Sequence, residues 1–155
     1  MNKKIIIISG VILLVLLLSF CFIYTFNTVR IDGTYFNVPN GYQIDDEGDY
    51  INLTSGTNYI CLVKEVKNDD VNKLIKEYVN SKKVKENDTI SVSSFKVDNL
   101  NVYKSISNNN DKTVHYWFVK YGKSYELFTW VANSNSDKIV SDLIKTMKPA
   151  ELHII

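Results

Sequence analysis

The chain carries few side chains that could act as metal ligands or nucleophiles. It has two histidines, His115 and His153, and two cysteines, Cys21 and Cys61. A zinc site needs three or four ligands at a recognisable spacing, such as H-E-x-x-H or paired C-x-x-C, and neither pattern occurs. Cys61 and His115 could form a nucleophile–base pair across a sheet, but no third orienting group is evident. We therefore predict no catalytic and no cofactor-binding residues, and we interpret Cys61 as a buried, inert thiol.

One segment gathers the acidic residues Asp45, Asp46, Glu47 and Asp49. Calcium prefers several carboxylate and carbonyl oxygens that converge in a turn, and Gly48 would permit a tight turn here. The spacing is not that of an EF-hand, which needs a Glu at its twelfth position. We predict a solvated loop, and these four residues are the candidates for a cation site.

Other sequence signatures point to no particular chemistry. Neither phosphate-binding loop, G-x-x-x-x-G-K-[ST] or G-x-G-x-x-G, is present, and there is no G-x-S-x-G nucleophile motif. Two N-x-[ST] sequons begin at Asn52 and Asn87, and they are candidate glycosylation sites if the host glycosylates outside its membrane. The sequence therefore favours a binding protein over an enzyme.

The segment that must position everything else is the apolar run Ile5–Phe26, twenty-two residues without a charged side chain. As a helix it would span about 33 Å, enough to cross a hydrocarbon core of about 30 Å. Lys3 and Lys4 precede it, which by the positive-inside tendency places the N-terminus in the cytoplasm and the remaining chain outside. We predict a single-pass cell-membrane protein with an uncleaved signal anchor.

Three other kinds of segment could contain such an apolar run. A cleaved secretory signal normally has a shorter apolar region and a small-x-small cleavage site, and neither is evident here. A lipoprotein needs a small residue before the modified cysteine, but Phe20 precedes Cys21. A pilin-like subunit would carry a Glu where this chain has Val15. Retention as an anchor remains the prediction.

The rest of the chain is long enough for one domain. Of 18 basic residues, 16 lie beyond Lys3 and Lys4, against 17 acidic ones. This balance excludes the basic excess typical of a nucleic-acid-binding surface. We predict five parts: a cytoplasmic tip at 1–4, the anchor at 5–26, a juxtamembrane linker at 27–33, an α/β sandwich domain at 34–150, and a tail at 151–155.

Hydrophobic periodicity indicates the elements of that domain. Val71, Leu74, Ile75 and Tyr78 form the stripe of an amphipathic helix, and a second helix runs from about Ser134 or Ser136 to Met147. The expected strands cover 35–38, 50–54, 59–66, 89–95, 100–107, 113–121 and 123–132. The predicted fold class is α+β, an antiparallel sheet of about six strands sandwiched by two helices and preceded by one transmembrane helix.

Three stretches resemble PsbP/Mog1-like domains, over roughly residues 34–149. They are the strand and turn from Tyr35 to Tyr42, the segment Gly122 to Tyr125 before an aromatic strand, and the closing helix ending at Ile144 to Met147. The resemblance implies a fold, and docking onto other proteins rather than turnover. PsbP proteins are extrinsic photosystem subunits and Mog1 proteins bind a small GTPase, but no functional residue of either can be matched here.

The prediction is thus an extracytoplasmic, non-catalytic binding or assembly domain of a membrane protein. Its expected partners are the membrane, through the N-terminal helix, and another envelope protein. Two alternatives remain open. One is an envelope enzyme with an unrecognised site, and the other is a surface protein that binds a small ligand or cation.

Overall fold

The structure is a computed structural model that describes residues 3–26, 28–86, 88–108, 113–130 and 134–150; the side chains of residues 3–7, 20–26, 85, 86 and 134 are outside this description. It contains three α-helices in these ranges, together with one seven-stranded and one three-stranded antiparallel sheet.

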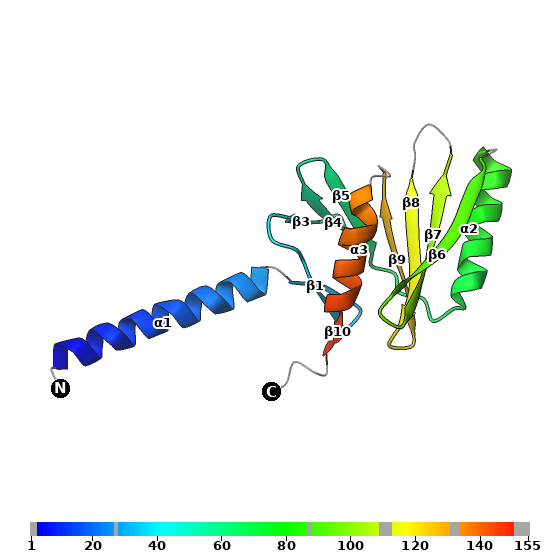
Figure 1. Ribbon diagram of the computed structural model, residues 1–155. Coiled ribbons are helices and arrows are strands. Elements are labelled where there is room, and N and C mark those ends of the chain that lie inside the picture. Colours follow the sequence, from blue (N-terminus) through cyan, green and yellow to red (C-terminus); the bar gives the residue numbers. More distant parts are fainter. Residues whose placement is uncertain (1–2, 27, 87, 109–112, 131–133, 151–155) are drawn as a thin grey trace.

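Helix α1, Lys3–Phe26, contains the predicted apolar run and leads away from the sheets (Figure 1). Its large apolar side chains between Ile8 and Leu18 are each 54–61% exposed. Counting only described residues, none of the helices combines the length and the apolar character needed to span a bilayer.

The main sheet has the strand order β3-β4-β5-β9-β8-β7-β6. The expectation of about six strands needs correcting to seven, because Gln43–Asp46 pairs with β4 as an edge strand, β3. All four residues of β3 are exposed, so this strand lacks the alternation of buried and exposed residues that indicates strands in sequence. The other strands are β4 Tyr50–Ser55, β5 Asn58–Val63, β6 Ile90–Val97, β7 Leu100–Ser107, β8 Val114–Lys120 and β9 Lys123–Thr129.

A second sheet joins the two ends of the domain. It has the order β1-β2-β10, with β1 Thr28–Ile31, β2 Thr34–Asn37 and β10 Lys148–Pro149. Residues 27–33, predicted to be a linker, therefore include a strand. Asp32 and Gly33 have φ of 41° and 75°, the left-handed pair that a two-residue hairpin turn requires. The strand 35–38, predicted in the main sheet, belongs to this sheet as β2.

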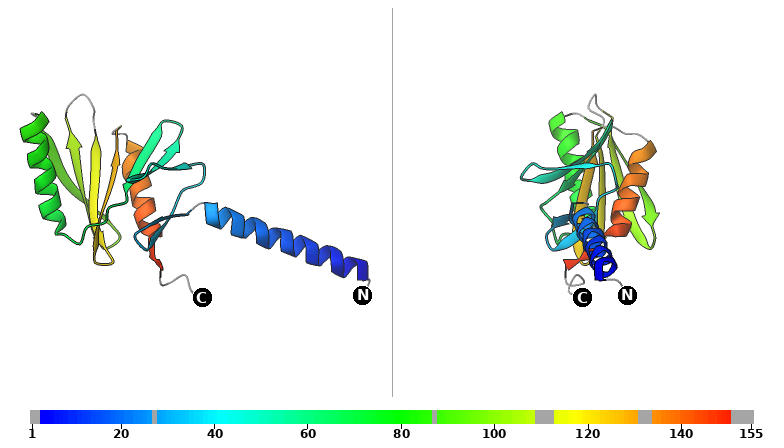
Figure 2. Two further views of the ribbon diagram at one scale, coloured as in Figure 1. Left: turned by 180° about the vertical axis from the view of Figure 1, so that it is seen from behind. Right: turned by 90° about the vertical axis from the view of Figure 1, so that its left-hand side faces the viewer.

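One helix covers each face of the main sheet, and Figure 2 shows α2 and α3 on opposite sides of it. Helix α2, Val71–Glu86, begins where Asp70 Oδ1 accepts the backbone N–H of Asn72 at 2.9 Å, and it continues beyond the predicted end near Ser81. Helix α3 is Ser134–Thr146. We call the two sides of the sheet the α2 face and the α3 face.

The α3 face carries the main hydrophobic core. Its fully buried large side chains include Tyr116, Phe118, Leu127 and Leu143. Polar groups here are bonded to one another: Tyr116 donates its hydroxyl to Asp137 Oδ1 at 2.7 Å, and Lys104 Nζ contacts both oxygens of that carboxylate at 2.7 and 2.8 Å. The α3 face is therefore a packed, internally satisfied core.

Candidate binding cleft

The α2 face is built from alternate residues of neighbouring strands. Because residues directly opposite each other in a ladder share a face, the register brings one row of side chains together across the sheet. This row contains Asn52, Cys61, Phe128, His115 and Ser105, taken from β4, β5, β9, β8 and β7. Chemistry-bearing residues thus gather on this face.

His115 is the centre of an aromatic stack. Its ring lies parallel to Trp117 at 5.4 Å and to Phe128 at 5.3 Å, with interplanar angles of 16° and 17°. Tyr78 of α2 covers it at 4.4 Å. Its Nδ1 lies 2.6 Å from Glu126 Oε1 on the adjacent strand. An ionised carboxylate can only accept, so Nδ1 carries the proton and Glu126 fixes the tautomer.

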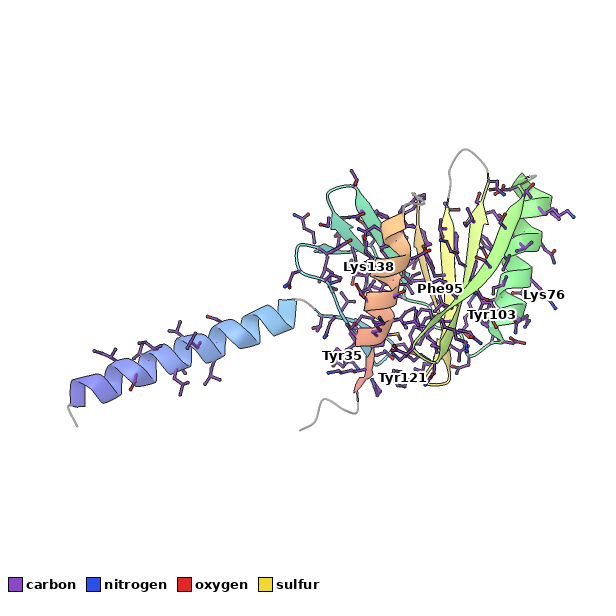
Figure 3. The ribbon with its side chains drawn as sticks, viewed as in Figure 1. Tyr35, Lys76, Phe95, Tyr103, Tyr121 and Lys138 are labelled. Atoms are coloured by element: carbon purple, nitrogen blue, oxygen red, sulfur yellow. The ribbon has the colours of Figure 1, made fainter. Side chains whose placement is uncertain are left out.

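A cavity of about 320 Å³ lies between α2 and strands β5, β9 and β8. Figure 3 labels Lys76, which points away from the sheet on the outer side of α2, and Tyr103, which belongs to strand β7. The cavity is near the lower end of the size range for small-molecule sites. It is lined by apolar, aromatic, hydroxyl and charged groups: Val63, Glu65, Lys67, Leu74, Glu77, Tyr78, Ser81, Trp117, Ser124, Tyr125 and Glu126. We call it the α2 cleft.

Three buried hydroxyl oxygens in the described part of the chain have no hydrogen-bond partner, and all lie on the α2 face. They belong to Tyr78, Ser105 and Thr113. Burial raises the pKa of the Tyr78 phenol, and the nearby Thr113 hydroxyl offsets part of this rise. No hydrogen bond of normal geometry joins the Tyr78 and Thr113 hydroxyls. Native proteins rarely leave such atoms unpaired. Their concentration here marks the α2 face as the less optimised side.

The part of the face over β4, β5 and β9 holds a second aromatic group. Tyr59 contacts Trp130 at 4.6 Å, Phe128 contacts Trp130 at 5.0 Å, and Tyr50 contacts Phe128 at 6.1 Å. Trp130 is 42% exposed. Both tryptophans of the chain, Trp117 and Trp130, therefore lie on the α2 face, and their fluorescence is sensitive to changes there.

The structure does not bring Cys61 and His115 together. The register places Phe128 between them, and two strand spacings separate their backbones by about 10 Å. Cys61 is fully buried and donates its S–H to Asn52 Oδ1 at 2.9 Å. Burial raises the pKa of this thiol to about 11, so it stays protonated at neutral pH.

The four acidic candidates lie at the edge of the main sheet that strand β3 forms. Asp45 and Asp46 end β3, and Glu47 and Asp49 follow in the turn to β4. Asp46 pairs with Lys64, and this contact holds the pKa of Asp46 below its usual value. In the described ranges, no three His, Cys, Asp or Glu side chains are grouped so that they could hold a metal ion.

The remaining sequence candidates divide between core and undescribed segments. Asn52 is buried in β4, and its amide oxygen accepts from Cys61. A buried strand residue is a poor glycan acceptor, since the modified side chain must project into solvent. Asn87 and His153 lie outside the described residues.

Sequence reasoning did not identify Glu126 and Tyr78 as site residues, although a signal for Glu126 existed. The two-residue turn at Tyr121 and Gly122 pairs Lys120 with Lys123, which fixes the whole β8–β9 register. Counting back from that turn places Glu126 opposite Trp117 and diagonal to His115. Tyr78 belongs to the apolar stripe that predicts the helix, and the sequence alone gives no sign of the cavity beside it.

Comparison with known proteins adds a resemblance of fold. The sequence matches no family model and no curated protein. The structure is similar to the solution structure of cyanobacterial PsbP (CyanoP) from Synechocystis sp. PCC 6803, at 11% identity and a TM-score of 0.46, over 76% of this chain and 87% of that one. This match names the group that the sequence resembles; no residue role, ligand or partner follows from it.

Proposed function

We propose that the protein is a single-pass membrane protein that presents a non-catalytic binding domain outside the cell membrane. The observation that carries the binding role is the α2 cleft: a cavity with aromatic and charged lining on one face of an otherwise well-packed domain. Cavities of this kind, with a few convergent polar groups, are the usual place for a ligand.

The anchoring role rests on the apolar run of α1. Its residues Ile8 to Leu18 are exposed on all sides of the helix, and a helix that is apolar all round needs an apolar environment. In the sequence, the uncharged run Ile5–Phe26 has the length of a bilayer span, whereas the part of α1 whose side chains are described is shorter than one. Lys3 and Lys4 would then lie on the cytoplasmic side. Lipid is the environment that these residues suit.

The proposed role is binding because the candidate groups for turnover are held apart. The Cys61 thiol is buried, bonded to Asn52 and separated from His115 by Phe128. The His115 proton on Nδ1 is held by Glu126, an arrangement that fixes the ring but offers no nucleophile. The proposed partner is a small ligand or an envelope protein. Nucleic acid is not a proposed partner, because the nearly balanced charge lacks the basic excess of a nucleic-acid-binding surface.

Two measurements test the topology in native membranes. The full chain should stay in the pellet after alkaline carbonate washing and enter the supernatant only with detergent. Protease added to intact cells should destroy a C-terminal epitope while a cytoplasmic control protein survives. Release by carbonate, or a protected epitope, would refute the anchored, outward-facing arrangement.

A protein partner would dock on the α2 face around the cleft and not inside it, and this part of the proposal has its own test. In-cell photo-crosslinking from a probe at position 94, on the α2 face, is compared with a probe at exposed Lys138 on α3. A protein partner that docks on the α2 face should yield adducts from position 94 alone. Equal adducts from both positions would argue that neither face is selective.

A further inference from the structure

We propose that the α2 cleft binds an organic ammonium group, a primary or quaternary amine of small size. This inference deepens the proposed binding function and rests on it. It identifies the ligand class from the charge, the aromatic surface and the size of the cleft.

The charge of the lining favours a cation. The residues that line the cleft include three carboxylates, Glu65, Glu77 and Glu126, and one ammonium group, that of Lys67. Lys82 Nζ adds a second positive charge 6.0 Å from the Tyr78 ring, so three negative charges less two positive leave a formal charge of −1. Lys67 Nζ is 3.9 Å from Glu65 Oε2, a loose contact between exposed side chains that neutralises little. A positively charged ligand gains from this field, and an anion is repelled.

The aromatic lining favours an organic cation over a metal ion. Trp117 and Tyr78 both line the cleft, with ring centroids 5.1 Å apart. Trp117 is only 2% exposed and stacks on His115, so the Tyr78 ring is the more accessible aromatic surface. The face of an aromatic ring attracts ammonium groups, most strongly for tryptophan. A divalent metal would need several converging oxygens, and the described residues provide no such group.

Glu126 is the residue best placed to meet the ligand. It stands on a central strand, and its Oε1 is held by His115 at 2.6 Å, which leaves the Oε2 oxygen for another donor. Its side chain is 32% exposed and lines the cleft, so the carboxylate is accessible and fixed in position at once. Such preorganisation reduces the entropy lost on binding.

The size of the cavity limits the ligand. A volume of about 320 Å³ accommodates a small amine but not a nucleotide or a folded segment of protein. Choline and putrescine are suitable probes of the quaternary and primary classes. The neutral isostere of choline, 3,3-dimethylbutanol, has nearly the same shape without the charge.

The test is isothermal titration calorimetry on the full chain in a maltoside detergent, which carries no ammonium headgroup. We expect saturable binding of choline or putrescine, at least about tenfold tighter than 3,3-dimethylbutanol. Glu126→Gln should weaken binding at least about tenfold, since it removes the charge and keeps the shape. Glu47→Gln is the matched control, the same change in an exposed turn, and should leave affinity within about twofold.

Three results would overturn the proposal: neither cation binds, the neutral isostere binds equally well, or Glu126→Gln leaves affinity unchanged in a folded protein. Carbonate extraction and crosslinking from position 94 do not depend on this ligand. If they succeed while calorimetry fails, the ligand class is wrong and the anchored module stands. If the reverse holds, the ammonium site stands without the anchor.

Discussion

The two faces of the main sheet differ in how well their polar atoms are satisfied. On the α3 face, Thr34 and Tyr125 share a buried hydroxyl contact at 2.6 Å, and Asp137 holds both Tyr116 and Lys104. On the α2 face, the hydroxyls of Tyr78, Ser105 and Thr113 have no partner within the described chain, and a cavity separates helix from sheet.

The difference separates stability from function within one sheet. A close-packed face gives the domain its free energy of unfolding, because apolar area leaves water and the buried polar side chains described on this face are paired. A looser face leaves a cavity that a ligand can use, and of the three unpaired hydroxyls the one that belongs to a cleft residue is that of Tyr78. We therefore expect substitutions on the α3 face to affect stability and those around the α2 cleft to affect binding.

The largest effect should come from leucine truncation in the two helices. Leu143 of α3 is fully buried, so Leu143→Ala should lower the free energy of unfolding by about 3–5 kcal/mol. Leu74 of α2 is half-buried beside the cleft, and Leu74→Ala should cost about 1 kcal/mol. Urea denaturation of the full chain in detergent, followed by fluorescence, compares the two variants. Equal losses would contradict the division between the faces.

Alkaline pH should act on the α2 face through Cys61. The folded state holds the pKa of this thiol at about 11, whereas an unfolded thiol titrates near 8.5. Between these values the unfolded chain loses a proton that the folded chain keeps, so stability falls as pH rises, by about 1.4 kcal/mol per pH unit. Below about pH 8 the Cys61 thiol is protonated in both the folded and the unfolded state, so its titration no longer lowers the stability.

The measurement compares Cys21→Ser with Cys21→Ser/Cys61→Ala between pH 8 and pH 11. Burial and the neighbouring Cys61 both raise the pKa of the Tyr59 phenol, so the difference between the two slopes reports on Cys61 together with its effect on Tyr59. Identical slopes would mean that the thiol is not buried in a low-dielectric site.

The shared hydroxyl contact on the α3 face should be worth less than a buried leucine. Thr34→Val leaves the buried Tyr125 hydroxyl without its partner and should cost about 1–2 kcal/mol. Adding Tyr125→Phe removes the orphaned group, so the double variant should lose less than the sum of the two single losses. Additive losses in thermal or urea unfolding would show that the two hydroxyls do not interact.

The smallest effect, and of opposite sign, is expected at Ser105. Its hydroxyl is buried without a partner, so Ser105→Ala should be neutral or stabilising by up to about 1 kcal/mol. Ser124→Ala is the matched control on the same face, because that hydroxyl donates to Asp69 O at 2.6 Å and its loss should destabilise. A destabilising Ser105→Ala would indicate that this hydroxyl is satisfied.

Much of the fold follows from sequence periodicity. The stripe of Val71, Leu74 and Ile75 predicts α2, and the alternating aromatic pattern predicts β8 and β9 with apolar residues on both faces. Edge and end pairings do not follow. β3 is exposed throughout, and β10 has two residues, including Pro149, paired to a strand at the other end of the domain.

The site was less predictable than the fold. Cys61 was predicted to be buried, and the position of Glu126 beside His115 could have been counted from the turn at Tyr121. The cleft itself depends on how far α2 stands from the sheet. That distance is set by tertiary packing between Tyr78, Trp117 and His115, which no local pattern encodes.

The most direct test of the account is the fluorescence of Trp117 in the Trp130→Phe variant of the full chain, titrated with choline. Trp117 is then the only tryptophan, and it lines the α2 cleft. We predict a saturable change in its emission, lost in Glu126→Gln and kept in Glu47→Gln. An emission spectrum that does not respond to choline or putrescine, or one that responds equally in Glu126→Gln, would contradict a binding role for this cleft.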